Sequence, residues 1–474
     1  MAIPNIMQTG RSAMVAAKTG IATTGHNISN ANTEGYSRQR VSTHAAESIG
    51  GQFGKNTVGT GVAVSRVERL NDHYIEKQIR NSQKDLSHFE EKDLILRQVE
   101  DIFNEMSGDG LNRFISRFFN EFRKLSEEPE SPAIRQSLRE SAQSMTNDFH
   151  RLRQEVVAVA QHADQRIEGF VGEVNHIAQE LADLNQRISW VERSGGSPND
   201  LLDKRDLIFR KLGSYFDVSM SQDKNGSFNV DIKGVGPLVM ADRAEHLSVE
   251  GTPANRSGKP EAGLDILSSG NVLGTITYSL QGGKLGALIE ARDKMIATVL
   301  DRLDEMAFAL THAVNQIHSQ GFNSEGISGI PFFSPLQEPN RAAEWISLSE
   351  EVQLSIDQIA TGLLPESPGD NRVALAIAQL QNEKLIDHGH ATADEWFNSM
   401  VTDVGIASAK NRSSMLQEKD IILQLNKVRE QISGVSIDEE TANLMEFQHA
   451  FDASAKVIQV ADDLLKTVLS LKRD

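Results

Sequence analysis

The sequence of 474 residues contains no cysteine. This absence excludes disulfide bonds, thiolate metal sites and a cysteine nucleophile. It also fits a chain that is exported unfolded, although many cytosolic proteins lack cysteine too. Aromatic residues are scarce as well, at 5% of the chain against 39% hydrophobic residues in all. This balance favours helices that pack through aliphatic side chains over one thick mixed core, and the length predicts roughly two to four domains.

Long apolar runs and an excess of positive charge are also missing. No stretch approaches roughly eighteen uncharged apolar residues, so we expect no membrane-spanning segment. The first residues have neither the basic nor the apolar region of a cleaved secretion signal, which predicts a cytosolic protein or one exported without cleavage. The formal net charge of −18 and the pI near 5.2 argue against nucleic acid and anionic lipid as partners, because both need a basic face.

Both ends of the chain carry apolar residues at seven-residue spacing, which is typical of helices that pair in a left-handed supercoil. Near the N-terminus the a-like positions are Met7, Met14, Ile21 and Ile28, and the d-like positions are Gly10, Ala17, Thr24 and Ala31. Near the C-terminus the a-like positions are Leu444, Phe451, Ile458 and Leu465, and the d-like positions are Phe447, Ser454, Ala461 and Val468. Small residues on one helix and large ones on the other predict that the two ends pair, within one chain or between chains.

The two ends also carry opposite net charge. Residues 1–43 hold four basic groups and one acidic group, whereas residues 435–474 hold eight acidic groups and four basic ones. Exposed ion pairs contribute only about 0.2–1 kcal/mol each. The charges therefore support pairing weakly, and the seven-residue spacing carries the prediction.

Apolar periodicity predicts a mainly helical chain that is interrupted by extended segments. Helices are expected over residues 5–30, 72–106, 111–125, 132–191, a shorter stretch ending at 212, 284–319, from 371, and from 392 almost to the end. Extended chain with short strands is expected over residues 38–67 and 213–283. In the second of these, Asn225 and Gly226 supply the positive φ angles of a hairpin turn, and alternating apolar residues follow it.

The order of these segments predicts an elongated molecule of nested, discontinuous domains. The fold class is mainly α with a small β-rich inserted domain. Residues 1–60 and 435–474 are expected to form a terminal helical domain whose helices make a coiled-coil-like pair. Residues 61–212 and 284–434 are expected to form a long-helix bundle, and residues 213–283 a small β-rich outer domain at the tip.

Patterns that suggest catalysis or metal binding lack the partners they need. His388 and His390 have no third ligand at a suitable spacing, so a solvated loop is the favoured interpretation. The Gly-x-Gly patterns at residues 59–61 and 234–236 lack the third glycine and the helix start of a phosphate-binding loop. A calcium loop opening at Asp223 is excluded because its glycine comes too early. We predict no enzyme and no catalytic, cofactor-binding or metal-binding residues.

The most specific motif lies at the end of the first expected helix. Residues 28–39 read Ile-Ser-Asn-Ala-Asn-Thr-Glu-Gly-Tyr-Ser-Arg-Gln. They resemble the N-terminal signature of the bacterial flagellar axial proteins, the family of rod and hook proteins. The Gly-Tyr-Ser-Arg-Gln ending is similar to that of the hook-associated proteins at the hook–filament junction, although Glu34 replaces the proline that is common before the glycine. The family motif is carried by Asn30, Asn32, Thr33, Gly35, Tyr36, Ser37 and Arg38.

Further segments extend the resemblance over most of the chain. They are residues 433–440, 202–206, 282–288 and 368–371, together with Asn443, Leu444, Gln448 and Ala453. The resemblance implies a structural protein that the flagellar type III apparatus secretes uncleaved to the extracellular flagellum. There a ring of subunits is expected to adapt the hook to the filament. The terminal helices are expected in the inner tube, the long helices in the next shell and the β domain outside.

The resemblance also implies partners. Other copies of the chain, the hook protein and a second junction protein are expected in the assembly, and an export chaperone is expected to bind the C-terminal helix before secretion. We expect neither nucleic acid nor membrane as a partner. We predict that the terminal helices carry an assembly seam, masked before export because an open apolar surface invites premature polymerisation. Its residues are Met7, Met14, Ile21, Ile28, Leu444, Phe447, Phe451, Ile458 and Leu465.

Two alternatives differ from this interpretation. Another flagellar axial protein, such as hook protein, shares the core of the motif. The Ser37-Arg38-Gln39 ending and the long helices of the middle domain argue against it. An enzyme on a helical scaffold is the alternative from a different class, and no residues of the sequence support it.

Overall fold

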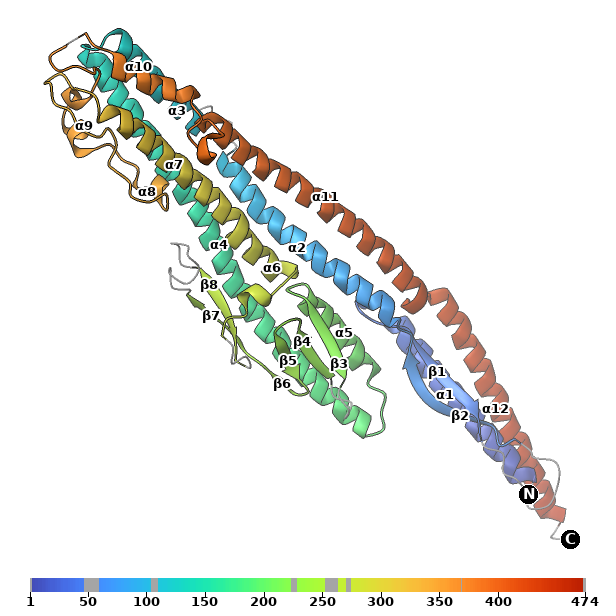
Figure 1. The fold of residues 1–474 in the computed structure, drawn as a ribbon. Helices are drawn as coiled ribbons and strands as arrows, with labels where there is room; N and C mark the ends of the chain where they lie inside the picture. Colours follow the sequence, from blue (N-terminus) through green and yellow to red (C-terminus); the bar gives the residue numbers. More distant parts are fainter. Residues whose placement is uncertain are drawn as a thin grey trace. The chain divides into compact units, whose positions relative to one another are not determined.

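The computed structural model describes residues 2–46, 59–103, 110–222, 228–251, 263–269, 274–367 and 369–471. These residues are mainly helical, with short strands between the helices (Figure 1). The chain divides into two compact units, each assembled from separate stretches. The terminal unit comprises Met1–Asp85, Val174–His246 and Gln417–Asp474, and the bundle unit comprises Leu86–Glu173 and Leu247–Leu416.

In the terminal unit, the two ends of the chain lie side by side. Helix α1 (Ala2–Ser29) packs along α12 (Ile437–Leu471), in blue and red in Figure 1. The antiparallel hairpin of β1 (Gln39–Ala45) and β2 (Val62–Arg69) packs against α1. The predicted pairing of the terminal helices is therefore confirmed, and it takes place within one chain.

Helix α12 begins where the sequence supplies a break and a cap. Helix α11 (Ala393–Ser433) ends before Gly434, and the Ser436 hydroxyl then accepts a hydrogen bond from the Glu439 N–H at 3.5 Å. Three acidic residues occupy the first turn of α12, where the helix dipole favours negative charge. Helices were expected from residue 392 almost to the end, and the structure divides this stretch into α11 and α12.

The strands after α5 (Asn199–Gly213) form a small antiparallel sheet in the order β3–β4–β5–β6. Their bounds are β3 (Val218–Gln222), β4 (Phe228–Ile232), β5 (Gly236–Met240) and β6 (Arg243–Ala244). Asn185 on α4 (Pro132–Arg193) attaches the sheet to that helix, because its Nδ2 donates to the carbonyls of Phe228 and Ala241 at 3.2 and 2.9 Å. The predicted turn at residues 225–226 lies outside the described residues, but Gln222 and Phe228 on its two sides are paired.

The bundle unit takes parts of α2 (His73–Phe103), α4 and α11 and adds the following elements. They are α3 (Leu111–Glu127), β7 (Leu247–Gly251), β8 (Leu264–Ser268), η1 (Thr277–Ser279), α6 (Gly283–Glu290), η2 (Ala291–Ile296), α7 (Ala297–His318), α8 (Ala342–Trp345), α9 (Glu350–Leu354), η3 (Ile356–Gln358), α10 (Arg372–Gln379), η4 (Leu380–Asn382) and η5 (Asp387–Gly389). A cluster of aromatic side chains forms part of its core, which is otherwise mainly aliphatic. Phe332 lies against Phe118, Phe122 and Phe333, with ring centroids 4.9 to 5.7 Å apart.

The fold class predicted from the sequence is confirmed, since the protein is mainly helical with a small sheet-rich region. Two details differ. The helix expected over residues 284–319 contains the π turn η2, which widens a single turn and is too local to change the average apolar period. The β-rich segment is divided between the units, because β3–β6 belong to the terminal unit and β7–β8 to the bundle unit. The division into three domains stays a prediction.

Among the helices of the described residues, none is long and apolar enough to cross a membrane.

Candidate assembly site

Helix α1 meets α12 through small residues. Gly20 lies so close to the Phe447 ring that a Cβ on Gly20 would be 2.6 Å from the nearest ring carbon. Ile458 approaches Gly10 in the same way, with its Cγ1 at 2.8 Å from such a Cβ. Real Cβ atoms do not come that close to other atoms. Large side chains of α12 therefore lie directly against the backbone of α1, as in a pairing of small with large residues.

The structure leaves only one of the predicted heptad residues exposed, namely Val468. The half-buried ones are Met7, Met14, Ile21, Ile28, Ala31, Leu444, Phe447, Phe451, Ile458 and Leu465. The buried ones are Gly10, Ala17, Thr24, Ser454 and Ala461. The most buried part of the contact is thus built from small residues, and the larger residues keep part of their surface open. Their role in assembly stays a prediction.

At the end of α1, the family motif folds into a polar cluster around Asn27. The Asn27 Nδ2 donates to the Gln39 carbonyl at 2.9 Å and to Glu440 Oε2 at 2.8 Å. The Asn27 Oδ1 accepts hydrogen bonds from the Gln39 N–H at 3.0 Å and from the Tyr36 hydroxyl at 2.7 Å. One buried side chain therefore connects α1, the start of β1 and α12. Such a fully bonded buried amide favours a single arrangement of the segments around it.

Arg38 and Glu440 add an ion pair between the motif and α12. The Arg38 Nε donates to Glu440 Oε1 at 2.7 Å, and its Nη1 donates to Glu439 Oε2 at 3.0 Å. Glu440 is only 2% exposed, so its carboxylate depends on these donors to offset the loss of water. The Arg38 N–H also donates to the carbonyl of Ser433, the last residue of α11, at 2.9 Å. The ion pair therefore fixes the position of α12 along α1.

A second set of contacts joins the motif to α5. The Ser37 N–H donates to Asp203 Oδ2 at 3.0 Å, and Arg69 Nη1 donates to Asp203 Oδ1 at 2.9 Å. Burial raises the pKa of the Asp203 carboxyl, and these two donors oppose that rise. The Gln39 Nε2 donates to Asp200 Oδ1 at 2.8 Å, in the first turn of α5. The motif is therefore the place where the helix pair is connected to the rest of the terminal unit.

The remaining motif residues shape the turn between α1 and β1. The Asn30 Nδ2 donates to the carbonyl four residues earlier at 3.0 Å, and the Thr33 hydroxyl donates to Asn30 Oδ1 at 3.2 Å. Gly35 has a φ of +79°, in the left-handed region that favours glycine, and lies against Leu207 of α5. Asn32 is exposed in this turn. Burial is the main cause that raises the pKa of the Tyr36 hydroxyl, which therefore keeps its proton and donates.

The two most connected residues of the cluster, Asn27 and Glu440, were not among the predicted site residues. The asparagine-rich helix end around Asn27 was interpreted as a stop signal. A polar residue in line with Gly20 and Thr24 could have identified it, because a buried asparagine in a helix contact sets the register. Glu440 stands in a run of three acidic residues, and nothing in that run indicates which one is buried.

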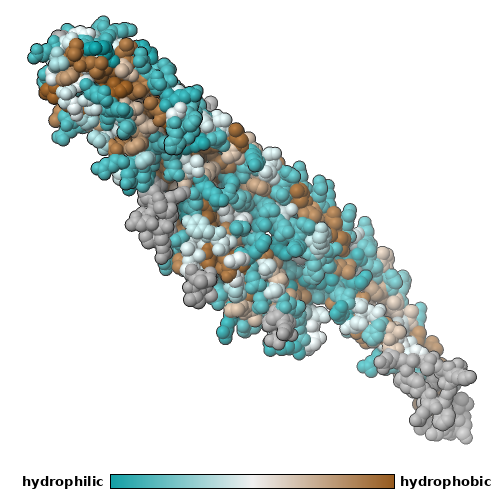
Figure 2. All heavy atoms as spheres, viewed as in Figure 1, coloured by the Kyte–Doolittle hydropathy of each residue, from teal (hydrophilic) through white to brown (hydrophobic). Residues whose placement is uncertain are grey.

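Helix α12 also presents an apolar face that no described residue covers. Val457, Val460, Leu464 and Val468 are between 41% and 59% exposed. Their spacing of three or four residues places them on one side of the helix. Figure 2 shows hydrophobic residues at the surface over α12 among hydrophilic ones. An exposed apolar row of this length on a charged protein indicates an interaction surface.

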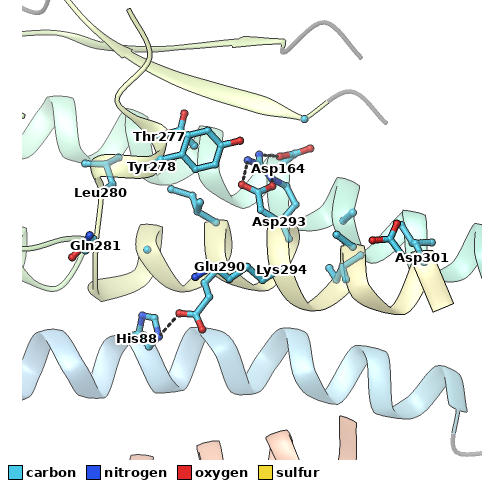
Figure 3. A pocket seen from close by; sticks show the side chains of 18 of the residues that line it. His88, Asp164, Thr277, Tyr278, Leu280, Gln281, Glu290, Asp293, Lys294 and Asp301 are labelled. Atoms are coloured by element: carbon cyan, nitrogen blue, oxygen red, sulfur yellow. Dashed lines mark hydrogen bonds and ion pairs between the residues drawn. The ribbon is translucent and has the colours of Figure 1, made fainter. Parts of the chain in front are cut away.

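The bundle unit contains a cavity of about 680 Å³ (Figure 3). It is lined by residues of α2, α4, η1, α6, η2 and α7, and several of its charged groups are paired. Glu290 lies 3.4 Å from His88 Nε2 and 2.8 Å from Lys92 Nζ, and these partners lower its pKa to about 2. Arg292 Nη1 donates to Asp164 Oδ1 at 2.5 Å. These pairs hold helices together and leave little reactive character in the groups that form them.

In the described part of the chain, no three His, Asp or Glu side chains are placed to hold a metal ion. His388 and His390 lie exposed in the loop around η5. The His390 Nδ1 is hydrogen-bonded to the Asp387 carbonyl at 2.6 Å.

Three family models match the chain in chain order. Residues 7–36 match the flagella basal body rod protein, residues 96–333 match the helical domain of the flagellar hook-associated protein FlgK, and residues 430–471 match the C-terminal part of the flagellar basal body rod FlgEFG proteins. The two rod models coincide with α1 and α12 and include the polar cluster residues Asn27, Tyr36 and Glu440.

Full-length relatives agree with these matches. Flagellar hook-associated protein 1 of Bacillus subtilis is 27% identical, over 98% of this chain and 97% of that protein. The protein of the same name from Salmonella typhimurium is 26% identical, over 97% of this chain and 98% of its own length. The solved structure of the flagellar hook junction protein FlgK from Burkholderia pseudomallei shares the fold at 16% identity and a TM-score of 0.66, covering 75% of this chain and 100% of that one. Since the FlgK model alone spans half of the sequence, the chain belongs to the flagellar hook-associated protein FlgK family.

Proposed function

We propose that this chain is a structural subunit of the bacterial flagellum that forms the junction ring adapting the hook to the filament, without catalytic activity. It is exported uncleaved by the flagellar type III apparatus and is placed outside the cell, at the distal end of the hook. Its neighbours are other copies of the chain, the hook protein and a second junction protein. An export chaperone holds α12 before secretion.

The observation that carries this proposal is the incomplete burial of the terminal helix pair. Helices α1 and α12 bury small residues against each other, while larger seam residues stay half-buried and Val460 and Leu464 stay exposed. Such a helix pair buries more apolar surface when copies pack side by side. The free energy gained in this way offsets the conformational entropy that is lost when the helices become ordered. The names of the relatives, hook-associated and hook junction proteins, support the position at the junction.

Hook protein is the alternative within the flagellum. It shares the terminal motif, so α1 and α12 do not separate the two assignments. The middle of the chain does, because residues 96–333 match the FlgK helical domain. That region includes all of α4, a single helix of 62 residues, and the aromatic cluster around Phe332. The junction is therefore the better-supported position.

Deletion of the gene, followed by electron microscopy of the cells, tests this proposal. Hooks of normal length without filaments, together with filament protein in the medium, are expected. Filaments should return when the wild-type chain is supplied from a plasmid. Filaments of normal number and length in the deletion strain would overturn the proposed function.

The assembly seam is tested by placing a charge in it. Phe451→Asp should abolish motility, because a carboxylate cannot be buried without a partner when neighbouring subunits close over α12. The matched control is Gln448→Asp, which adds the same charge at an exposed position of the same helix. Circular dichroism of both purified variants should show the helix content of the wild type. Normal swimming of the Phe451 variant would remove this residue from the seam.

A further inference from the structure

The segment between α7 and α10 of the bundle unit exposes four large aliphatic side chains, called here the apolar patch. Leu354 is 78% exposed, Leu364 56%, Ile327 47% and Leu363 44%. Figure 2 shows hydrophobic residues gathered where α9 and α10 lie, among hydrophilic ones. An exposed apolar group of this size on a charged protein indicates a docking surface.

The backbone under the apolar patch is held in place by two polar side chains. The Asp370 Oδ2 accepts hydrogen bonds from the N–H groups of Leu363 and Leu364 at 2.8 and 3.2 Å. The Asn323 Oδ1 accepts a hydrogen bond from the Ile327 N–H at 2.8 Å. The patch is therefore presented on a fixed frame, so that little conformational entropy is lost when a partner covers it.

Acidic side chains lie beside the apolar patch. Glu325 and Glu366 are both exposed, and their loops lie together, since a Cβ on Gly326 would be 4.0 Å from the Glu366 nitrogen. The nearby cation Arg372 is bound to Asp370 at 2.7 Å, so its charge is balanced within the chain. The patch therefore favours a partner surface that is partly apolar and carries positive charge.

Helix α3 of the bundle unit has a surface of this kind. A groove of about 770 Å³ lies along its exposed side, and the half-buried Phe114 is among the residues that line it. Arg113, Arg117 and Lys124 recur at spacings of four and seven residues, which places them on one face of the helix. The charged lining comprises Arg113, Arg117, Arg123, Lys124, Glu121 and Glu127. Four basic groups and two acidic ones make this basic groove positive, on a chain whose net charge is −18.

The apolar patch and the basic groove face different sides of the bundle unit. Helix α8 packs on α7, α7 packs on α10, and α10 packs on α3. In Figure 1 the gold and orange loops around α9 lie at one edge of this unit, and α3 lies at the other. Phe118 of α3 is directed inward against Phe332, so the basic face of α3 points away from the core. The patch therefore cannot reach the groove of its own chain.

We infer that the apolar patch of one copy packs into the basic groove of α3 on a neighbouring copy. This inference rests on the proposed function, because copies placed side by side around one axis turn different sides toward each other. The aliphatic side chains of the patch cover Phe114, and Glu366 meets cations of the groove such as Arg117. Since the two surfaces differ, the contact repeats from copy to copy, and the opposite charges fix which side meets which.

Photo-crosslinking identifies the neighbour of the apolar patch. The photoreactive residue p-benzoylphenylalanine replaces Leu364 in the full chain, which is expressed in the deletion strain. Isolated flagella are irradiated, and the products are identified by mass spectrometry. Covalent dimers of the chain are expected, with the crosslink on α3. The control carries the photoreactive residue in place of Glu168, an exposed residue of α4, and should give no crosslink to α3.

The other possible occupants of the patch are outcomes of the same experiment. A crosslink from position 364 to the hook protein or to another flagellar protein would overturn the inference, and so would dimers joined patch to patch. No crosslink at all, in cells with complete filaments, would also overturn it and leave the proposed function standing. Complete filaments in the deletion strain itself would instead overturn the proposed function.

Charge reversal provides a second measurement of the same contact. Arg117→Glu places like charges together and should lower the yield of the photo-crosslink about tenfold. Glu366→Arg in the same chain should restore the yield, because every contact then holds the pair in reverse. The matched control is Lys410→Glu, which reverses an exposed charge on α11 of the same unit and should leave the yield unchanged. A loss that Glu366→Arg does not restore would contradict the pairing of patch and groove.

Discussion

Large apolar side chains are fully buried in the bundle unit but only half-buried in the terminal helix pair. Phe118, Phe122 and Phe332 of the bundle unit are at most 1% exposed, and their ring centroids lie 5.2 to 5.7 Å apart. In the terminal pair the buried apolar residues are Ala17 and Ala461, and Phe447 keeps part of its surface open. The two regions have similar helices and very different cores.

The difference indicates which region is stable by itself. Apolar burial contributes about 25 cal/mol per Å² and is the main favourable term in folding. The bundle unit collects this contribution within one chain. The terminal pair gains only part of this stabilisation within one chain. Its register depends on the polar cluster around Asn27. We therefore expect the bundle unit to set the stability of the monomer and the terminal pair to respond to assembly.

The largest expected effect comes from removing one phenylalanine from each region. Phe332→Ala should lower the free energy of unfolding by about 3–5 kcal/mol, because a fully buried ring leaves a cavity. Phe447→Ala should cost less than about 1.5 kcal/mol in the monomer, since its ring is half-buried. Urea unfolding followed by circular dichroism measures both values.

In assembly the order of the two effects should be reversed, so that the Phe447 substitution causes the larger loss. The Phe447 variant is expected to attach few filaments to its hooks, and the Phe332 variant, at a temperature where it is folded, should attach nearly the normal number. Equal losses of monomer stability in the two variants would contradict the comparison, because they would mean that both regions have the same kind of core.

Acid should weaken the bundle unit through His318. Burial is the main cause that lowers the pKa of His318 from 6.5 to about 4. Its Nδ1–H donates to the Ile330 carbonyl at 2.8 Å and its Nε2 accepts from the Ala360 N–H at 2.9 Å, so the neutral form is the bonded one. The contribution to stability is complete above pH 6.5 and is lost as the pH falls toward 4, by about 3 kcal/mol.

This prediction is measured as the difference in unfolding free energy between pH 7 and pH 4. In His318→Gln that difference should shrink by about 3 kcal/mol relative to the wild type, because the variant has no group there to protonate. The control is His390→Gln, which changes an exposed histidine of the same unit and should keep the wild-type difference. An unchanged difference in the His318 variant would show that acid acts elsewhere in the chain.

Sequence periodicity was sufficient to predict the terminal helix pair. Seven-residue spacing survives in the structure because it reflects the geometry of two packed helices, and Gly10 and Gly20 do receive large side chains of α12. Helix ends followed equally simple signals. Gly434 lies where α11 ends, as expected of a residue that weakens helices.

The pairing of residues within the polar cluster could not be predicted from the sequence alone. Asn27 and Glu440 are 413 residues apart, and their hydrogen bond exists only because α1 and α12 lie side by side. The position of Asn27 in line with Gly20 is a signal that it lies in the helix contact, but nothing in the sequence identifies Glu440 as its partner, since glutamate is mostly exposed in proteins. The family motif located the right segment, but the partners of Ser37 and Arg38 on α5 and α12 follow from the fold.

Removing the ion pair at the start of α12 should loosen the terminal pair. Arg38→Met leaves the buried Glu440 carboxylate without its cation and should lower the opening free energy of α12 by about 2–3 kcal/mol. Hydrogen exchange of the α12 amides, followed by mass spectrometry, measures this value. Lys466→Met is the matched control, because its ion pairs on the same helix are exposed. Equal exchange in both variants would mean that the Arg38 pair contributes no more than a surface pair.

The smallest expected effect separates two glycines of the same helix. A Cβ at Gly20 would lie 2.6 Å from the Phe447 ring, whereas a Cβ at Gly25 meets nothing within 4 Å. Alanine in a helix is favoured over glycine by about 1 kcal/mol, so Gly25→Ala should slow hydrogen exchange in α1. Gly20→Ala has the same helical gain, but it pushes the ring away and should speed exchange in both α1 and α12, with a net loss of about 1–2 kcal/mol.

The contact with Phe447 is identified as the cause by combining two substitutions. In a Phe447→Ala background the ring is gone, so Gly20→Ala should become as favourable as Gly25→Ala, and the two effects are then non-additive. If Gly20→Ala still speeds exchange without the ring, the helices are held apart by something other than this contact. If Gly20→Ala is favourable even with the ring present, the terminal pair has room to adjust, and its close packing must come from neighbouring subunits.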